Sequence, residues 1–81
     1  MKLGIYTIEK TLYEGEVKEV IAKTTTGEIS ILQNHIPLVT RLTAGPLAFI
    51  AENGGRSELL IQSGFLEVQP EDGVVVLTDT V

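Results

Sequence analysis

Apolar and polar residues alternate along most of this chain with a period of two, not the 3.6 of a helix. Between Leu3 and Ile8, and again between Val17 and Lys23, successive side chains would point to opposite faces of an extended backbone. No window of 11 residues carries an apolar stripe with helical spacing. The pattern therefore predicts an all-β chain built from short strands.

Turn residues divide these strands at intervals of about 8 to 12 residues. The clearest predicted hairpin turns at Asn53-Gly54-Gly55, between the strand-like runs 46–52 and 57–62. A second is predicted at Pro70 to Gly73, between the runs 65–69 and 74–78. Many short strands at regular spacing favour a sandwich or a small barrel, and we expect two packed sheets.

The apolar members of the alternating runs form the predicted core of a monomeric sandwich. With 81 residues the chain is a single domain, residues 1–81. A domain of this size buries roughly 60% of the surface that its unfolded chain exposes. The predicted core residues are Ile5, Val17, Val20, Ile31, Leu47, Phe49, Leu59, Ile61, Phe65, Val68, Val74 and Val76.

Composition and charge favour the binding of a partner over catalysis as the function of this chain. The net charge of −5 disfavours nucleic acid and anionic lipid as direct partners. There is no cysteine, the one histidine is His35, and no serine lies in a Gly-x-Ser-x-Gly elbow, so we expect no catalytic residue, no cofactor and no metal site. The apolar runs are shorter than the about 20 residues of a membrane span. A protein partner is the remaining expectation.

One segment, residues 27–40, is too polar to be explained as scaffold. It carries a carboxylate at Glu28, the amide pair Gln33 and Asn34, and the imidazole of His35, followed by the rigid Pro37. Such a loop suits polar contacts with a partner.

The same segment resembles the signature of the N-terminal domain of the epsilon subunit of F-type ATP synthases, typically Gly-Glu-x-Gly-Ile-Leu-x-x-His-x-Pro-Leu. Here Gly27-Glu28, Ile31-Leu32, His35 and Pro37-Leu38 match in spacing. Residues 10–17 resemble the family's first turn, and residues 64–70 and 76–80 resemble its close. Ser30, Gln33 and Ser63 depart from residues usual in the family.

The resemblance implies a flattened antiparallel β-sandwich of about ten short strands in the central stalk of the synthase. There it would bind the gamma subunit and rest on the c ring, coupling proton or sodium translocation to ATP synthesis without catalysing anything itself. Its place would be peripheral, at the cytoplasmic face of the bacterial inner membrane, with membrane contact only through the c ring. The family usually continues into two C-terminal helices that inhibit ATP hydrolysis or bind ATP, and we expect this chain to lack that regulation.

The expected contact residues follow from the resemblance and from the pattern. We predict an apolar patch for gamma and a polar end for the c ring, with Glu28 and His35 projecting from the same end of the sandwich. The alternative is that Glu28 is only a turn carboxylate and His35 only a hydrogen-bonding loop residue. The predicted gamma contacts are Tyr13, Leu42, Leu77 and Val81, and the predicted c-ring contacts are Glu28, Gln33, Asn34 and His35.

A small acidic carrier domain of the lipoyl or biotinyl type is the alternative function. Such a domain needs a modifiable lysine at an exposed hairpin tip. The predicted tips at 53–55 and 70–73 hold no lysine, which favours the first hypothesis.

Overall fold

The computed structural model describes residues 1–71 and 73–79, and within these residues the chain forms eight strands and no helix. No segment of this described part is a helix that could span a membrane. The strands are β1 (Lys2–Tyr6), β2 (Thr11–Thr24), β3 (Gly27–Leu32), β4 (Leu38–Leu42), β5 (Gly45–Ala51), β6 (Arg56–Ile61), β7 (Gly64–Gln69) and β8 (Gly73–Thr78).

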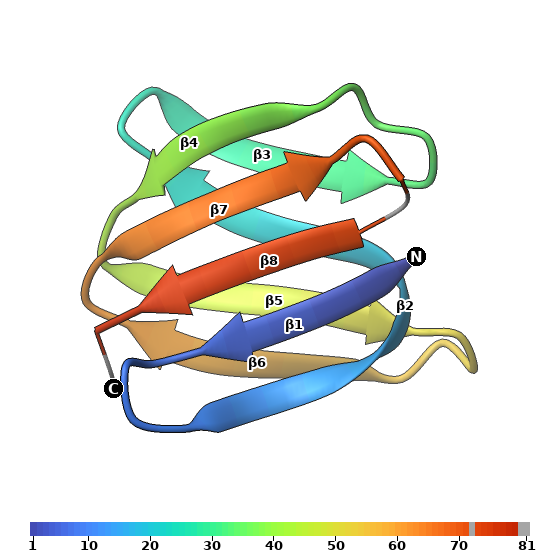
Figure 1. Cartoon of the computed structure of the whole chain (residues 1–81), viewed down its shortest axis with the longest axis horizontal. Coiled ribbons are helices and arrows are strands. Elements are labelled where there is room, and N and C mark those ends of the chain that lie inside the picture. Colours follow the sequence, from blue (N-terminus) through green and yellow to red (C-terminus); the bar gives the residue numbers. More distant parts are fainter. Residues whose placement is uncertain (72, 80–81) are drawn as a thin grey trace.

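The strands lie in two layers, so the predicted β-sandwich is confirmed (Figure 1). Strands β4, β7, β8, β1 and the first part of β2 make the front layer in that view, and β3, the rest of β2, β5 and β6 lie behind them. The pairings are antiparallel except for β1 with β8, which run parallel. The described residues hold eight strands where about ten were expected.

Strand β2 belongs to both layers. Its residues 11–16 pair with β1, and its residues 17–24 pair with β3 and β5. A bulge at Lys18 sets two residues of β2 against one of β5, since Val17 faces Ala51 and Glu19 faces Ile50. The extra residue shifts the alternation, so both Val17 and Val20 are buried.

Ten of the twelve predicted core residues are buried, and Leu59 is half-buried against them. Phe65 was predicted to be in the core and is instead 51% exposed. Strict alternation along β7 turns Leu66 and Val68 inward, which sends Phe65 outward. Three buried leucines were missed by the prediction: Leu3, Leu42 and Leu66.

Both predicted hairpins are confirmed. Strand β5 pairs with β6, and β7 pairs with β8, each as antiparallel neighbours. At the first turn Gly54 has a φ of 92°, which a glycine adopts without a steric penalty. The Gly55 N–H donates to Asn53 Oδ1 at 2.8 Å, so this turn is held by its own side chain.

Candidate protein-binding site

The outward side of the front layer carries a band of mainly apolar side chains, which we call the β7–β8 face. The strand register places Arg41, Phe65, Leu77 and Tyr6 in one row across β4, β7, β8 and β1. Val39 and Val75 belong to the neighbouring row, where Glu67 lies between them. The β7–β8 face consists of Tyr6, Val39, Arg41, Phe65, Glu67, Val75 and Leu77.

Three large apolar side chains of this face are open to solvent. Val39 is 70% exposed, Leu77 53% and Phe65 51%. The Arg41 guanidinium carbon lies 5.6 Å from the centroid of the Phe65 ring, within the range of a cation–π contact. The face is therefore apolar along the row of Phe65 and Leu77, positively charged at Arg41 on β4 and negatively charged at Glu67 on β7.

A shallow groove of about 430 Å³ lies at one end of this face, between Arg41, Phe65, Leu77 and the loop residue Ile8. Ile8 is fully exposed. Its loop is nevertheless ordered by Thr7, whose Oγ1 accepts from the N–H groups of Glu9 at 3.2 Å and Lys10 at 3.1 Å. The Thr7 N–H also donates to the Lys10 carbonyl at 2.8 Å. A fully exposed isoleucine on a hydrogen-bonded loop is a ready contact point for a partner.

The four predicted gamma contacts are not brought together. Leu77 lies on the β7–β8 face, and Val81 lies outside the described residues. Tyr13 is half-buried, with its ring centroid 4.3 Å from that of Phe49. Leu42 is only 1% exposed, so its prediction as a surface contact is wrong: alternation along β4 turns it inward.

The exposed residues Ile8, Val39 and Phe65 were missed by the sequence prediction. The signal for Phe65 was present, because Val68 was already assigned to the core. A period of two from Val68 places Leu66 inside and Phe65 outside.

The predicted c-ring residues lie at opposite ends of β3, so the expectation that Glu28 and His35 share an end is wrong. Glu28 is exposed at the second position of the strand, and His35 follows its last residue. A strand of six residues is about 20 Å long at about 3.3 Å per residue. The strand itself therefore separates the two side chains.

The loop after β3 uses its polar groups within the chain. Gln33 Oε1 accepts from the Met1 α-ammonium at 3.2 Å. The His35 N–H donates to the Leu32 carbonyl at 3.1 Å, and His35 Nδ1 lies 2.7 Å from the Ile36 carbonyl oxygen. Asn34 has a φ of 67°, in the left-handed region that asparagine tolerates. These contacts give the side chains of Gln33 and His35 local roles within the chain.

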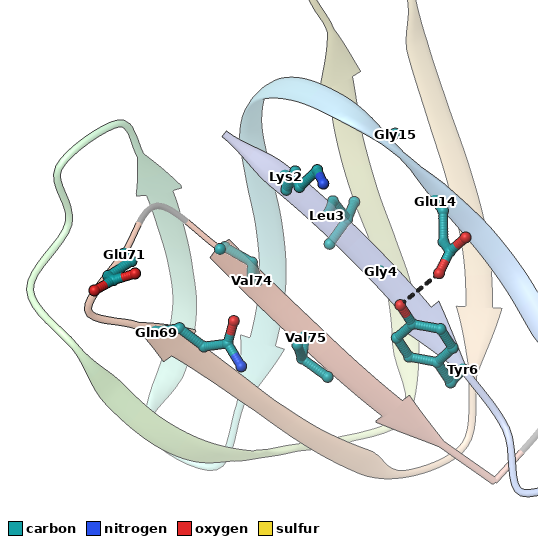
Figure 2. A pocket seen from close by; sticks show the side chains of 11 residues that line it. Lys2, Leu3, Gly4, Tyr6, Glu14, Gly15, Gln69, Glu71, Val74 and Val75 are labelled. Carbon is teal, nitrogen blue, oxygen red and sulfur yellow. Dashed lines mark hydrogen bonds between the residues drawn. The ribbon is translucent and has the colours of Figure 1, made fainter.

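A second groove, of about 330 Å³, lies beside the β7–β8 face over β1 (Figure 2). The Tyr6 hydroxyl donates to Glu14 Oε2 at 2.8 Å, from β1 to β2. This hydrogen bond is the main reason that the pKa of Tyr6 is raised above its usual value, with partial desolvation and the Glu14 charge adding to it. The Tyr6 side chain lies directly over Gly4. A Cβ placed at Gly4 would be 2.3 Å from Tyr6 Oη, so the tyrosine occupies the space that a side chain there would need.

Within residues 1–71 and 73–79, no three histidine, aspartate or glutamate side chains gather closely enough to hold a metal ion. What the described surface offers instead is an exposed apolar face with two adjoining grooves. A small β-sandwich with such a face is typical of the class of domains that bind other proteins.

Comparison with known protein families is consistent with a domain that binds other proteins. The family described as "ATP synthase, Delta/Epsilon chain, beta-sandwich domain" matches residues 1–81, and the chain belongs to this family. The family match also decides between the two hypotheses drawn from the sequence, against the carrier domain.

Curated relatives named ATP synthase epsilon chain are similar over nearly all of this chain. The protein from an Exiguobacterium species is 42% identical over 78 residues, which are 96% of this chain. The protein from Acinetobacter baumannii is 42% identical over 80 residues, or 99% of this chain. In both cases the match spans 57% of the relative's own length.

Two solved structures share the fold. A chain of the Euglena gracilis mitochondrial ATP synthase superposes with a TM-score of 0.90 at 24% identity, covering 95% of this chain and 49% of that one. A chain from the central stalk and c ring of the Tetrahymena thermophila mitochondrial ATP synthase has a TM-score of 0.81 at 18% identity, covering 96% of this chain and 62% of that one.

Proposed function

We propose that this chain is the β-sandwich part of a central-stalk subunit of an F-type ATP synthase, and that it binds the gamma subunit through the β7–β8 face. It has no catalytic role of its own and couples ion translocation to ATP synthesis by linking gamma to the c ring. In that assembly it lies at the cytoplasmic face of the bacterial inner membrane, held there through the c ring.

The observation that carries the proposal is the exposure of Phe65 and Leu77 side by side on neighbouring strands. Burial of both against a partner removes apolar surface from water, and aromatic side chains are enriched among the residues that dominate binding energy. The Arg41 guanidinium over the Phe65 ring adds a charge that a partner carboxylate would pair with.

The test is the affinity for purified gamma subunit of the double variant Phe65→Asp/Leu77→Asp. Both side chains are half exposed, so the variant should fold, which far-ultraviolet circular dichroism checks. We expect a loss of at least about 2 kcal/mol, roughly thirtyfold in Kd. The matched control is Leu60→Asp, which changes a 66% exposed leucine on β6 in the other layer. Unchanged gamma binding by a folded double variant would assign gamma to another surface.

For the c ring, we assign the end of the sandwich that carries Glu28. Gln33 Oε1 and His35 Nδ1 are engaged within the chain, whereas the Glu28 carboxylate is exposed beside the turn between β2 and β3. Basic groups on the ring's polar loops would pair with it. One exposed ion pair is worth only about 0.2 to 1 kcal/mol, and repetition of the loop around the ring would supply further contacts.

Glu28→Lys tests this assignment in reconstituted complexes. The change reverses a charge at an exposed position, so we expect weaker proton-coupled ATP synthesis with near-normal ATP hydrolysis by the soluble part. Glu52→Lys, in the turn at the opposite end, is the control and should leave coupling unchanged. Full coupling in Glu28→Lys would reduce Glu28 to a turn residue.

A further inference from the structure

The turn between β5 and β6 carries the dipeptide Asn53-Gly54 at its tip. Asparagine is one of the chemically labile residues of proteins. It loses its side-chain amide when the main-chain nitrogen of the next residue attacks its Cγ, and a glycine in that next place has no Cβ to hinder the attack. The chain has one other asparagine, Asn34, which is followed by the bulkier His35. Asn53 is therefore the asparagine that the sequence exposes to this reaction.

The surroundings of the turn leave the reacting atoms accessible. Residues 52–55 are all exposed. Among the residues that the structure describes, none beyond its two neighbours in the chain would come within 4 Å of a Cβ built at Gly54. Solvent and a base therefore reach the Gly54 nitrogen without displacing a side chain. The turn lies at the end of a hairpin, so it can open locally while β5 and β6 stay paired.

Two hydrogen bonds of the closed turn engage the groups that must react. The Gly54 N–H donates to the Ala51 carbonyl at 2.9 Å. Asn53 Oδ1 accepts from the Gly55 N–H at 2.8 Å, which holds the carboxamide in one orientation. When the Gly54 nitrogen joins Cγ in a cyclic imide it carries no hydrogen, so its bond to Ala51 is necessarily lost. The closed turn therefore disfavours cyclisation, and the open turn permits it.

We propose that Asn53 is a site of spontaneous deamidation that reacts when the turn between β5 and β6 opens. The Gly54 nitrogen loses its proton to a base in solution and forms a bond to Cγ. The bond from Cγ to the side-chain nitrogen breaks, and that nitrogen takes a proton from solvent and leaves as ammonia. Water then opens the imide at either carbonyl, which leaves aspartate or isoaspartate at this position. The inference is independent of the proposed function.

The two products have different effects on the hairpin. Aspartate keeps a side-chain oxygen that accepts from the Gly55 N–H, so the turn closes again. Isoaspartate runs the main chain through the side-chain methylene and lengthens the turn by one backbone atom. The longer turn no longer matches the spacing at which the Ala51 N–H donates to the Gly55 carbonyl, at 2.8 Å. We therefore expect the isoaspartate form to be less stable than the parent.

The experiment incubates the purified chain at mildly alkaline pH, in buffer and in guanidinium chloride, and follows deamidation by mass spectrometry. Trypsin, which cleaves after lysine and arginine, releases Asn53 in the peptide 42–56 and Asn34 in the peptide 24–41, so Asn34 is an internal control in every sample. We expect Asn53 to react about tenfold more slowly in the folded chain than in the unfolded chain, which corresponds to about 1.4 kcal/mol. Asn34 should react slowly in both.

Two variants separate the chemistry from the fold. Gly54→Ala, measured in guanidinium chloride where the turn is absent, places a Cβ beside the attacking nitrogen and should slow the reaction at Asn53. Asn53→Asp should unfold at the urea midpoint of the parent, whereas the isoaspartate form, separated by chromatography from the aged sample, should unfold at a lower urea concentration.

Two results would overturn the inference. Equal rates at Asn53 in the folded and the unfolded chain would show that the turn does not control the reaction. A rate at Asn53 in guanidinium chloride no higher than that at Asn34 would show that this dipeptide is not a deamidation site.

Discussion

Phe65 and Leu66 are neighbours on β7 that point to opposite sides of the front layer. Replacing each by alanine tests which of the two side chains is in the core. Leu66 is 0% exposed, in the core between the layers, whereas Phe65 is 51% exposed on the β7–β8 face. We expect Leu66→Ala to be strongly destabilising and Phe65→Ala to be mild, although phenylalanine is the larger side chain.

The magnitudes follow from what each side chain contacts. Removing a buried leucine leaves a cavity and costs about 2 to 5 kcal/mol. A chain of 81 residues has a total stability of about 4 to 12 kcal/mol, so Leu66→Ala would remove a large part of it. Phe65→Ala loses the contact with the Arg41 guanidinium, about 0.5 to 1 kcal/mol, and part of its cross-strand contact with Leu77, about 0.2 to 1 kcal/mol.

Urea unfolding followed by far-ultraviolet circular dichroism measures the loss of stability in both variants. With a slope of about 1 to 3 kcal/mol per molar urea, Leu66→Ala should lower the midpoint by about 1 M or more, and Phe65→Ala by clearly less. The opposite order would refute the register of β7. A shift of one residue would turn Phe65 inward and put Leu66 and Val68 on the outer face.

Two further predictions concern a close backbone approach and a tyrosine. Gly64→Ala should destabilise the fold by about 1 to 3 kcal/mol, because its Cβ would lie 2.3 Å from the Leu77 carbonyl oxygen. The control is Gly73→Ala, whose Cβ meets only the flexible Gln69 amide, and equal urea midpoints for the two variants would contradict the predicted backbone clash. In a Tyr13→Phe background, ultraviolet titration of Tyr6 should give a pKa above 10.0 that falls when Glu14 is replaced by glutamine. Because the folded-state pKa is the higher one, the parent should lose stability as the pH rises through it, more steeply than Glu14→Gln; identical alkaline profiles would argue against the hydrogen bond.

The hairpins and most of the core were predictable because local signals decide them. An Asn-Gly turn between two apolar runs specifies a hairpin at Gly54 without reference to the rest of the fold. Ile5 and Val76 are apolar members of alternating strands, and both are buried. Local backbone preference and the hydrophobic pattern agree at these positions.

Two errors have different physical causes. Phe65 and Leu66 are both apolar, and size alone favours burying the phenylalanine, but β7 turns only every second residue inward. Glu28 and His35 are close in sequence, yet the strand between them carries them apart. The bulge at Lys18 was not predicted either, because alternation alone gives no signal for the extra residue, although Val17 and Val20 were both correctly assigned to the core.

Strand β2 makes the domain resistant to shear between its two layers. A sandwich whose layers touch only through side chains resists sliding with van der Waals contacts, which re-form readily after a small displacement. Here one 14-residue strand is hydrogen-bonded to β1 at one end and to β3 and β5 at the other, so shear between the layers requires breaking ladder hydrogen bonds. Under a twisting load the two layers therefore turn together as one stiff body.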